Sequence, residues 1–261
     1  NKEKYKIMLR AVKIRLIIGA GLVFFAVIKY CSSAEINPYT NEKQHIGLSE
    51  NEEIAMGLNA APQMAHQHGG LHLDTQYQAT VDRVGKKLVN SSIAKDSNYK
   101  FDFHLLANKR TINAFALPGG QIFITYALFS KLENIDQLAG ILGHEIGHVL
   151  GRHSAERIAK DGLTQGILSG VAVGVDPSAA QGAAAVAQLI NMKYGRDDEL
   201  QSDELGVQFM IKAGYNPEAL IGVMKILKDA AGPNSVPEFQ STHPDPENRV
   251  EKIKQAIKKY R

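Results

Sequence analysis

The sequence contains very little cysteine and no tryptophan: Cys31 is the one cysteine among 261 residues. A single thiol excludes an intrachain disulfide framework and a thiolate-rich zinc finger. With 23 glycines and 9 prolines the chain is not a fibrous repeat, and a hydrophobic fraction of 44% excludes global disorder. The length suits one large domain or two small ones, with enough chain to bury a substantial core.

The positive charge of the chain is small and lies mostly at the N-terminus. The formal net charge is +3, yet six of the basic residues fall within residues 1–15, where Glu3 is the one acidic residue. The rest of the chain therefore holds 24 basic and 26 acidic residues. Without a basic excess or a recognisable nucleic-acid-binding module, we expect no nucleic-acid partner.

An uncharged apolar run, Leu16 to Ile28, follows these basic residues and closes at Lys29. Thirteen helical residues span roughly 20 Å, less than the ~30 Å hydrocarbon core, so Arg15 and Lys29 would have to snorkel for this run to cross a membrane. A basic stretch followed by a short apolar stretch and polar residues is typical of a secretory signal or a short membrane anchor. A buried core helix is the alternative interpretation.

We therefore predict a signal or anchor segment over residues 1–33 and a functional domain over residues 34–261. The basic flank predicts a cytoplasmic N-terminus, with the domain exported to the periplasmic side of the inner membrane in the cell envelope. Cys31 lies where a lipoprotein cysteine would lie, but Tyr30 is bulky for the usual lipidation motif. Lipidation is therefore the less favoured interpretation.

The rest of the chain predicts an α+β fold, mostly helical with a small sheet. Ser49 with Glu52 forms a capping-box signature, and Asp74 is a second helix start. The patterns at 101–105, 112–117 and 121–124 predict short strands, and those after Tyr126 are helical nearly to the end. The small-residue stretches at 163–175 and 179–187 predict packed helices beside a cleft, or a mobile lid.

The most informative motif is His144-Glu145-Ile-Gly-His148, within an apolar helical pattern. Positions four apart face the same side of a helix, so both imidazoles can bind one ion. Zinc suits two neutral imidazoles with a carboxylate and leaves a fourth position for water. Glu145 follows the first ligand directly and is placed to act as general base on that water.

A third ligand is expected from the acidic segment that contains Glu199 and Asp203, again four residues apart. One carboxylate can bind the metal while the other accepts the remaining N–H of a ligand histidine. Spacing alone does not decide which carboxylate does which. A solvated acidic helix face is the alternative interpretation for each residue taken singly.

These motifs, with Asn113-Ala-Phe-Ala-Leu-Pro-Gly-Gly120 and Ser241-Thr-His243-Pro, resemble the membrane-associated zinc metallopeptidases of the Oma/HtpX/CAAX-prenyl-endopeptidase family. The segment Asn37 to Gln44 resembles the entry segment of its bacterial Oma-like branch. The resemblance runs from about Asn37 to Arg249. Ser202 stands where the family usually has alanine.

The resemblance implies a gluzincin fold with one zinc ion per chain and endopeptidase activity on proteins or peptides of the cell envelope. It implies that His144, His148 and Glu199 ligate the metal, that Glu145 is the base, and that Asp203 supports a ligand from behind.

Asn113, Ala114, Phe115 and Ala116 form a short strand that ends at a proline turn. Such a strand is a natural sheet edge and can pair with an extended peptide, although an ordinary hairpin would have the same pattern. The resemblance favours the substrate-binding interpretation, in which the edge strand borders the active-site cleft.

Several further side chains are candidates for the site or its surroundings. His243, in a Thr-His-Pro-Asp-Pro segment, is a candidate catalytic group that donates to the oxyanion or caps the zinc at rest. Arg249 is expected to anchor that loop on an acidic residue. Tyr194 is a weaker oxyanion candidate, and His153 is expected to face away from the metal.

Three histidines in a glycine-rich stretch, His66, His68 and His72, suggest a second metal site. We reject this site because the stretch has no acidic or thiolate ligands and is typical of an exposed connector.

The sequence thus predicts a zinc metalloendopeptidase that cleaves unfolded or misassembled envelope proteins. The alternative is a non-catalytic, zinc-stabilised assembly factor or holdase, and Glu145 argues against it because a scaffold needs no base. A soluble zinc aminopeptidase is a further alternative, but the sequence contains no identifiable acidic motif that would bind the substrate's terminal amine.

Overall fold

The computed structural model describes residues 2–171, 194–230, 238–244 and 248–261. The chain divides into two compact units. The first unit comprises Asn1–Gly47 and Ala155–Ala185, and the second unit comprises Leu48–Ser154 and Val186–Arg261. Each unit is described by itself.

The first unit contains the long helix α1 (Lys2–Ser32), which extends well beyond the apolar run that predicted it. Its segment Lys13–Ser32 is, by length and composition, long and apolar enough to cross a membrane, and little of that window is buried. A hairpin of β1 (Ala34–Ile36) and β2 (Lys43–His45) follows, in antiparallel register, and the sequence patterns did not predict it. The ring of His45 stacks on Tyr30 with the centroids 4.2 Å apart.

Most of helix α6 (His153–Val171) also belongs to the first unit. Gly166 on this helix lies against Ala26 of α1, so close that a β-carbon on Gly166 would be 2.5 Å from the Ala26 side chain. The predicted helix over 163–175 is present as far as Val171. The remainder of that stretch and all of 179–187 lie outside the described residues.

The second unit is built around a three-stranded sheet of β3 (Asp102–Leu106), β4 (Ala114–Ala116) and β5 (Gln121–Thr125). The strand order is β3-β5-β4, with β3 parallel and β4 antiparallel to β5. Strand β4 is therefore an edge strand, as predicted. The strands lie within one or two residues of the predicted positions.

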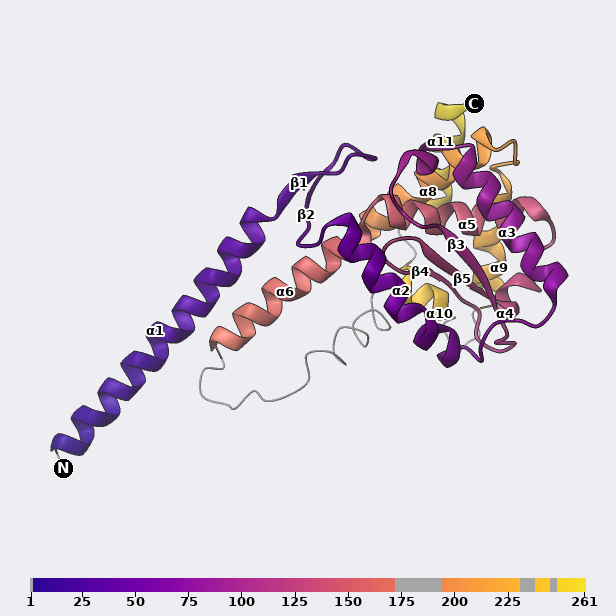
Figure 1. Cartoon of the computed structure of the whole chain (residues 1–261). Helices are drawn as coiled ribbons and strands as arrows, with labels where there is room; N and C mark the ends of the chain where they lie inside the picture. The colour runs from indigo at the N-terminus through magenta and orange to yellow at the C-terminus, as the bar shows by residue number, and fades with distance from the viewer. Residues whose placement is uncertain (1, 172–193, 231–237, 245–247) are drawn as a thin grey trace. The chain divides into compact units, whose positions relative to one another are not determined.

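Helices of the second unit surround this sheet (Figure 1). They are α2 (Glu50–Gln67), α3 (Thr75–Asn90), α4 (Tyr126–Phe129), α5 (Ile135–Leu150), α8 (Arg196–Lys212), α9 (Ala219–Asp229), α10 (Glu238–Thr242) and α11 (Arg249–Tyr260), with a 3₁₀ turn at Ile93–Asp96. Ser49 and Asp74 cap α2 and α3 as the sequence predicts. The mostly helical α+β fold is confirmed.

Helix α5 is the central helix of this unit, because every residue from Gln137 to Leu150 is buried. It packs along α8 at a distance that only glycine permits. A β-carbon on Gly147 would lie 2.9 Å from backbone atoms of Ser202, and one on Gly143 would lie 3.3 Å from the backbone of Gly206. The small residues bring the two backbones together, so that short side chains of α8 reach α5.

Candidate metal centre

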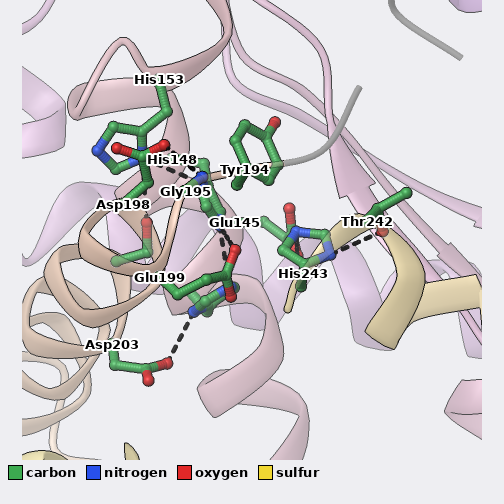
Figure 2. A network of polar contacts seen from close by, with 12 residues as sticks. Glu145, His148, His153, Tyr194, Gly195, Asp198, Glu199, Asp203, Thr242 and His243 are labelled. Atoms are coloured by element: carbon green, nitrogen blue, oxygen red, sulfur yellow. Dashed lines mark hydrogen bonds and ion pairs between the residues drawn. The ribbon is translucent and has the colours of Figure 1, made fainter. Parts of the chain in front are cut away.

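Four buried side chains converge between α5, α8 and the end of α10 (Figure 2). They are His144 and His148 on α5, Glu199 on α8, and His243 directly after α10. One potential ligand atom from each lies within 4.8 Å of all the others. Each residue is at most 2% exposed, so the atoms meet in a site shielded from solvent.

The distances between these atoms fit a small ion. The Nε2 atoms of His144 and His148 are 3.0 Å apart, and each is 3.4 Å from an oxygen of Glu199. Ligands at about 2.0–2.1 Å from a tetrahedral zinc ion would be separated by roughly 3.3–3.4 Å. Neither Glu199 oxygen forms a hydrogen bond among the described residues, although Arg249 Nη2 lies 3.3 Å from Oε2. A buried carboxylate in this position fits a metal ligand.

A carboxylate and an arginine hold His144 from behind. His144 Nδ1 donates to Asp203 Oδ1 at 2.8 Å, which leaves the Nε2 lone pair facing the other ligand atoms. Arg249 donates to both oxygens of Asp203, at 2.7 and 3.0 Å. Burial by itself would raise the pKa of Asp203, but Arg249 and His144 hold this pKa below its ordinary value. Asp203 is thus a fixed anion that orients the imidazole.

Glu145 lies beside this cluster without a hydrogen-bond partner for either carboxylate oxygen among the described residues. Its side chain is completely buried, and His243 Nε2 is 3.6 Å from Oε1 (Figure 2). Burial raises the pKa of Glu145 to about 8. A carboxylate that accepts a proton this readily has the property required of a general base near neutral pH.

His243 is buried rather than solvated, and contacts with Phe239 of the preceding helix α10 fix its orientation. Its Nδ1 lies 3.2 Å from the Phe239 carbonyl oxygen, and the two rings are stacked with centroids 4.3 Å apart. Burial holds the pKa of His243 well below its ordinary value, so the ring is neutral. With the proton on Nδ1 donated to that carbonyl, the Nε2 lone pair faces the cluster as a potential fourth ligand.

The comparison with known families agrees with this geometry. Residues 75–257, which contain α5, α8 and the converging side chains, match Peptidase family M48. The chain belongs to peptidase family M48.

Curated relatives of this M48 chain are metalloendopeptidases and assembly-related proteases. It is 28% identical to the mitochondrial metalloendopeptidase OMA1 of Schizosaccharomyces pombe over 92% of this chain and 69% of that protein. It is 30% identical to the beta-barrel assembly-enhancing protease of Escherichia coli over 85% of this chain and 47% of that protein. The bovine OMA1 metalloendopeptidase is 28% identical over 98% of this chain and 52% of its own length. The chain thus spans about half to two thirds of these relatives.

The structure corrects the expectation for His153. It is not one of the converging ligands, but it lies directly behind one of them, with Nδ1 2.9 Å from Nδ1 of His148. Five positions on a continuous helix would rotate the side chain by about 140° from His148. The helix is interrupted, however, and Arg152 has a φ of +54°, which turns His153 back toward α5.

His68 is also placed differently from the expectation of an exposed connector. It is 8% exposed and its ring lies 5.2 Å from that of Phe115 on β4. Gly69 and Gly70, both with φ of +82°, reverse the chain after α2 and leave His68 on the inner side of the turn. Of the other two histidines, His66 is exposed and His72 stacks on Tyr126.

A small cavity of about 40 Å³ lies beside the four converging side chains and is lined in part by one of them, His243. Its lining includes His68, Asn113, Phe115, Tyr194 and His243. The Tyr194 ring stacks on His148 with the centroids 3.9 Å apart, and its hydroxyl pairs with Ser154, so Tyr194 packs against one of the candidate ligands. The predicted site residues are therefore brought together, with strand β4 beside them.

Arg249 has a larger part in the site than the sequence predicts. The sequence predicts that Arg249 pairs with an acidic residue and so anchors the His243 loop. The guanidinium does pair with acidic residues, and these are Asp203, at 2.7 Å, and Glu199, at 3.3 Å. The sequence does not predict that both of these partners belong to the site itself. No local pattern could indicate this, because Arg249 lies at the start of α11, far along the chain from both carboxylates.

Proposed function

We propose that the chain is a zinc-dependent metalloendopeptidase with one zinc ion per chain. The observation that carries the proposal is the convergence of two imidazole nitrogens and one buried carboxylate, with a second unpartnered carboxylate, Glu145, beside them. His144, His148 and Glu199 would hold the metal. The chemistry of this donor set suits zinc, which in catalytic sites is held by three nitrogen or oxygen ligands with a fourth tetrahedral position left for water.

When bound, zinc would lower the pKa of a water molecule and polarise the carbonyl of the scissile bond. Glu145 takes the proton of that water at its carboxylate and later passes it to the leaving nitrogen. Asp203 accepts from His144 Nδ1 and is held by Arg249, and this pair would keep His144 oriented. The dry surroundings of Glu145 favour this shuttle, because burial keeps its basicity high.

The edge strand β4 is the proposed substrate-binding element. Backbone bonds join Asn113 to Thr125 and Leu117 to Gln121, so alternate residues pair inward with β5. The N–H and C=O groups of Ala114 and Ala116 therefore point to the outer edge. An extended peptide can pair there with little preference for sequence, while Asn113 and Phe115 line the adjoining cavity.

His243 has two proposed roles that belong to different states. In the described state its Nε2 lone pair faces the metal ligands, which supports a resting cap at the position that water must occupy. For the second role, the His243 ring would leave this position, become protonated and donate to the oxyanion. Tyr194, on the same side of the cavity, is the weaker candidate for that donor.

We further propose that the substrates are unfolded or misassembled proteins of the cell envelope. The bacterial relative's name refers to the assembly of β-barrels, and the other relatives are named as metalloendopeptidases. The apolar part of α1 supports a membrane anchor or export signal, with the peptidase on the periplasmic side. Backbone recognition by β4 suits unfolded chains, because only extended segments can add to a sheet edge.

The decisive variant is Glu145→Gln, which keeps the shape of the side chain and removes its basicity. We expect normal zinc content and a loss of cleavage of an unfolded protein of about 10²-fold or more. Peptides released from an envelope extract by the wild type and by this variant are compared by mass spectrometry. Undiminished cleavage by the variant would contradict the proposal. Binding of unfolded envelope proteins without any cleavage by the wild type would support a non-catalytic assembly factor instead.

A further inference from the structure

A series of two hydrogen bonds links three side chains, Gln201, His153 and His148, and ends at His148, one of the two proposed ligand histidines. His153 Nδ1 is 2.9 Å from His148 Nδ1, and His153 Nε2 is 2.8 Å from Gln201 Oε1. His148 and His153 are each 2% exposed. The three residues come from α5, α6 and α8. These hydrogen bonds therefore connect α5, which carries His148, to both α6 and α8.

The position of each proton along this series of hydrogen bonds follows from the proposed role of His148 as a metal ligand. A histidine that binds a metal through Nε2 carries its proton on Nδ1, so His148 Nδ1 donates to His153 Nδ1. His153 must then carry its own proton on Nε2, which donates to the amide oxygen of Gln201. The Ser202 hydroxyl lies 3.3 Å from the same Nδ1 of His153 and, as a donor, favours the same tautomer.

The local backbone is shaped to make room for this arrangement. A β-carbon on Gly151 would lie 2.3 Å from His153 Nε2 and 2.9 Å from Gln201 Oε1, on the very atoms of the second hydrogen bond. The positive φ of Arg152, which any residue with a side chain adopts at a cost, turns His153 under His148. Two features of the α5–α6 junction thus serve one contact.

The two ligand histidines are supported in different ways. His144 donates to the carboxylate of Asp203, which is paired with Arg249, whereas His148 donates to a neutral imidazole. An outer partner fixes both the tautomer and the direction of a ligand ring. His153 can do both, provided that Gln201 holds its proton on Nε2.

We propose that His153 is a positioning residue that keeps His148 in its metal-binding tautomer and orientation, with Gln201 fixing the tautomer of His153. The proposal rests on the zinc site assigned under the proposed function. His153 acts through His148 and touches neither substrate nor metal.

The test is the zinc dissociation constant of the full chain, measured by competition with a chromophoric chelator. His153→Phe removes the acceptor while filling the same space, and we expect zinc to bind about 10- to 100-fold more weakly. Gln201→Leu should weaken binding in the same direction. Gln201→Glu should keep the wild-type affinity, because a carboxylate can only accept from His153 Nε2 and preserves the tautomer.

A second readout is the visible absorption spectrum of the cobalt-substituted chain, which responds to the geometry of the ligands. The spectrum should change in His153→Phe and stay unchanged in Gln201→Glu. His104→Phe is the matched control, because His104 also pairs with a glutamine, Gln121, at 3.0 Å but lies on β3 outside the metal centre. It should leave both the affinity and the spectrum unchanged.

The outcomes separate this proposal from the one on which it rests. Absence of zinc binding by the wild type would overturn the proposed function. Zinc binding by the wild type with equal affinity in His153→Phe and Gln201→Leu would overturn the role of His153 alone. If His153→Phe fails to fold, as judged by circular dichroism, the contrast between Gln201→Leu and Gln201→Glu decides, and equal affinity of that pair would overturn the proposal.

Discussion

The polar atoms at the metal centre divide into those that have protein partners and those that have none. Asp203 and Arg249 are fully engaged with each other, whereas both oxygens of Glu145 and of Glu199 and the Nε2 of His243 form no hydrogen bond among the described residues. Buried polar atoms without partners are costly. Their clustering on one point is explained if an ion and a water molecule belong there.

The role of His243 can be tested at the scale of this residue. Because its neutral ring faces the ligand atoms through the Nε2 lone pair, we expect His243→Ala to open the fourth position and raise the basal rate of peptide cleavage. The rate is measured on a fluorogenic peptide with zinc content determined in parallel. His72→Ala, at a histidine outside the centre, is the control. A fall in the rate at unchanged zinc content would contradict this expectation and would show that the loss of the oxyanion donor outweighs the opening of the fourth position.

At the scale of the elements, the site depends on how closely α5 and α8 approach. The glycines of α5 bring the α8 backbone within van der Waals contact, and the carboxylates of α8 thereby reach imidazoles on α5. If the converging side chains bind the proposed zinc ion, its affinity should therefore depend on how α5 and α8 pack.

Gly147→Ala tests this coupling. The added β-carbon would lie 2.9 Å from the Ser202 backbone, so the helices must separate, at a cost of about 1–3 kcal/mol in the free energy of unfolding. We also expect weaker zinc binding. Urea unfolding of the metal-free chain and chelator competition measure the two effects.

Gly162→Ala is the matched control for this variant. It also replaces a glycine within a helix, but no atom of the described residues lies within 4 Å of its added β-carbon. It should be neutral or stabilising by up to about 1 kcal/mol. Equal effects of the two variants would show that the contact of α5 with α8 is not what matters.

The sequence predicted those parts of the elements that depend on local pattern. The helix around His144 follows from its apolar spacing, and the caps at Ser49 and Asp74 follow from residue type. The contacts of His153 and Arg249 could not be predicted in this way. They depend on a helix break after α5 and on packing between distant segments, and neither leaves a periodic signal.

At the scale of the whole molecule, the chain contains both the proposed metal centre and a long apolar helix. The count of charged residues separates a basic N-terminal segment from a slightly acidic remainder. The segment Lys13–Ser32 of α1 is largely exposed, with Phe24 and Phe25 each 67% accessible. An exposed apolar surface of this kind is costly in water and is satisfied by a lipid environment.

Replacing Phe24 and Phe25 with lysine should release the full chain from lipid vesicles. Each lysine near the centre of a membrane helix costs about 2.5–3.5 kcal/mol on the insertion scale. Flotation with phospholipid vesicles measures the bound fraction. Leu73→Lys, at an apolar residue that is 95% exposed in the second unit, should leave binding unchanged. Undiminished flotation of the double variant would contradict the membrane role of α1.

A single titration shows whether zinc held by His144, His148 and Glu199 makes this chain a peptidase. The full chain is stripped with a chelator and titrated with zinc while cleavage of an unfolded protein is followed. We expect no cleavage without metal and a rise in the cleavage rate that saturates at about one zinc per chain. Cleavage that persists in the stripped chain, or none at any zinc ratio, would contradict this expectation.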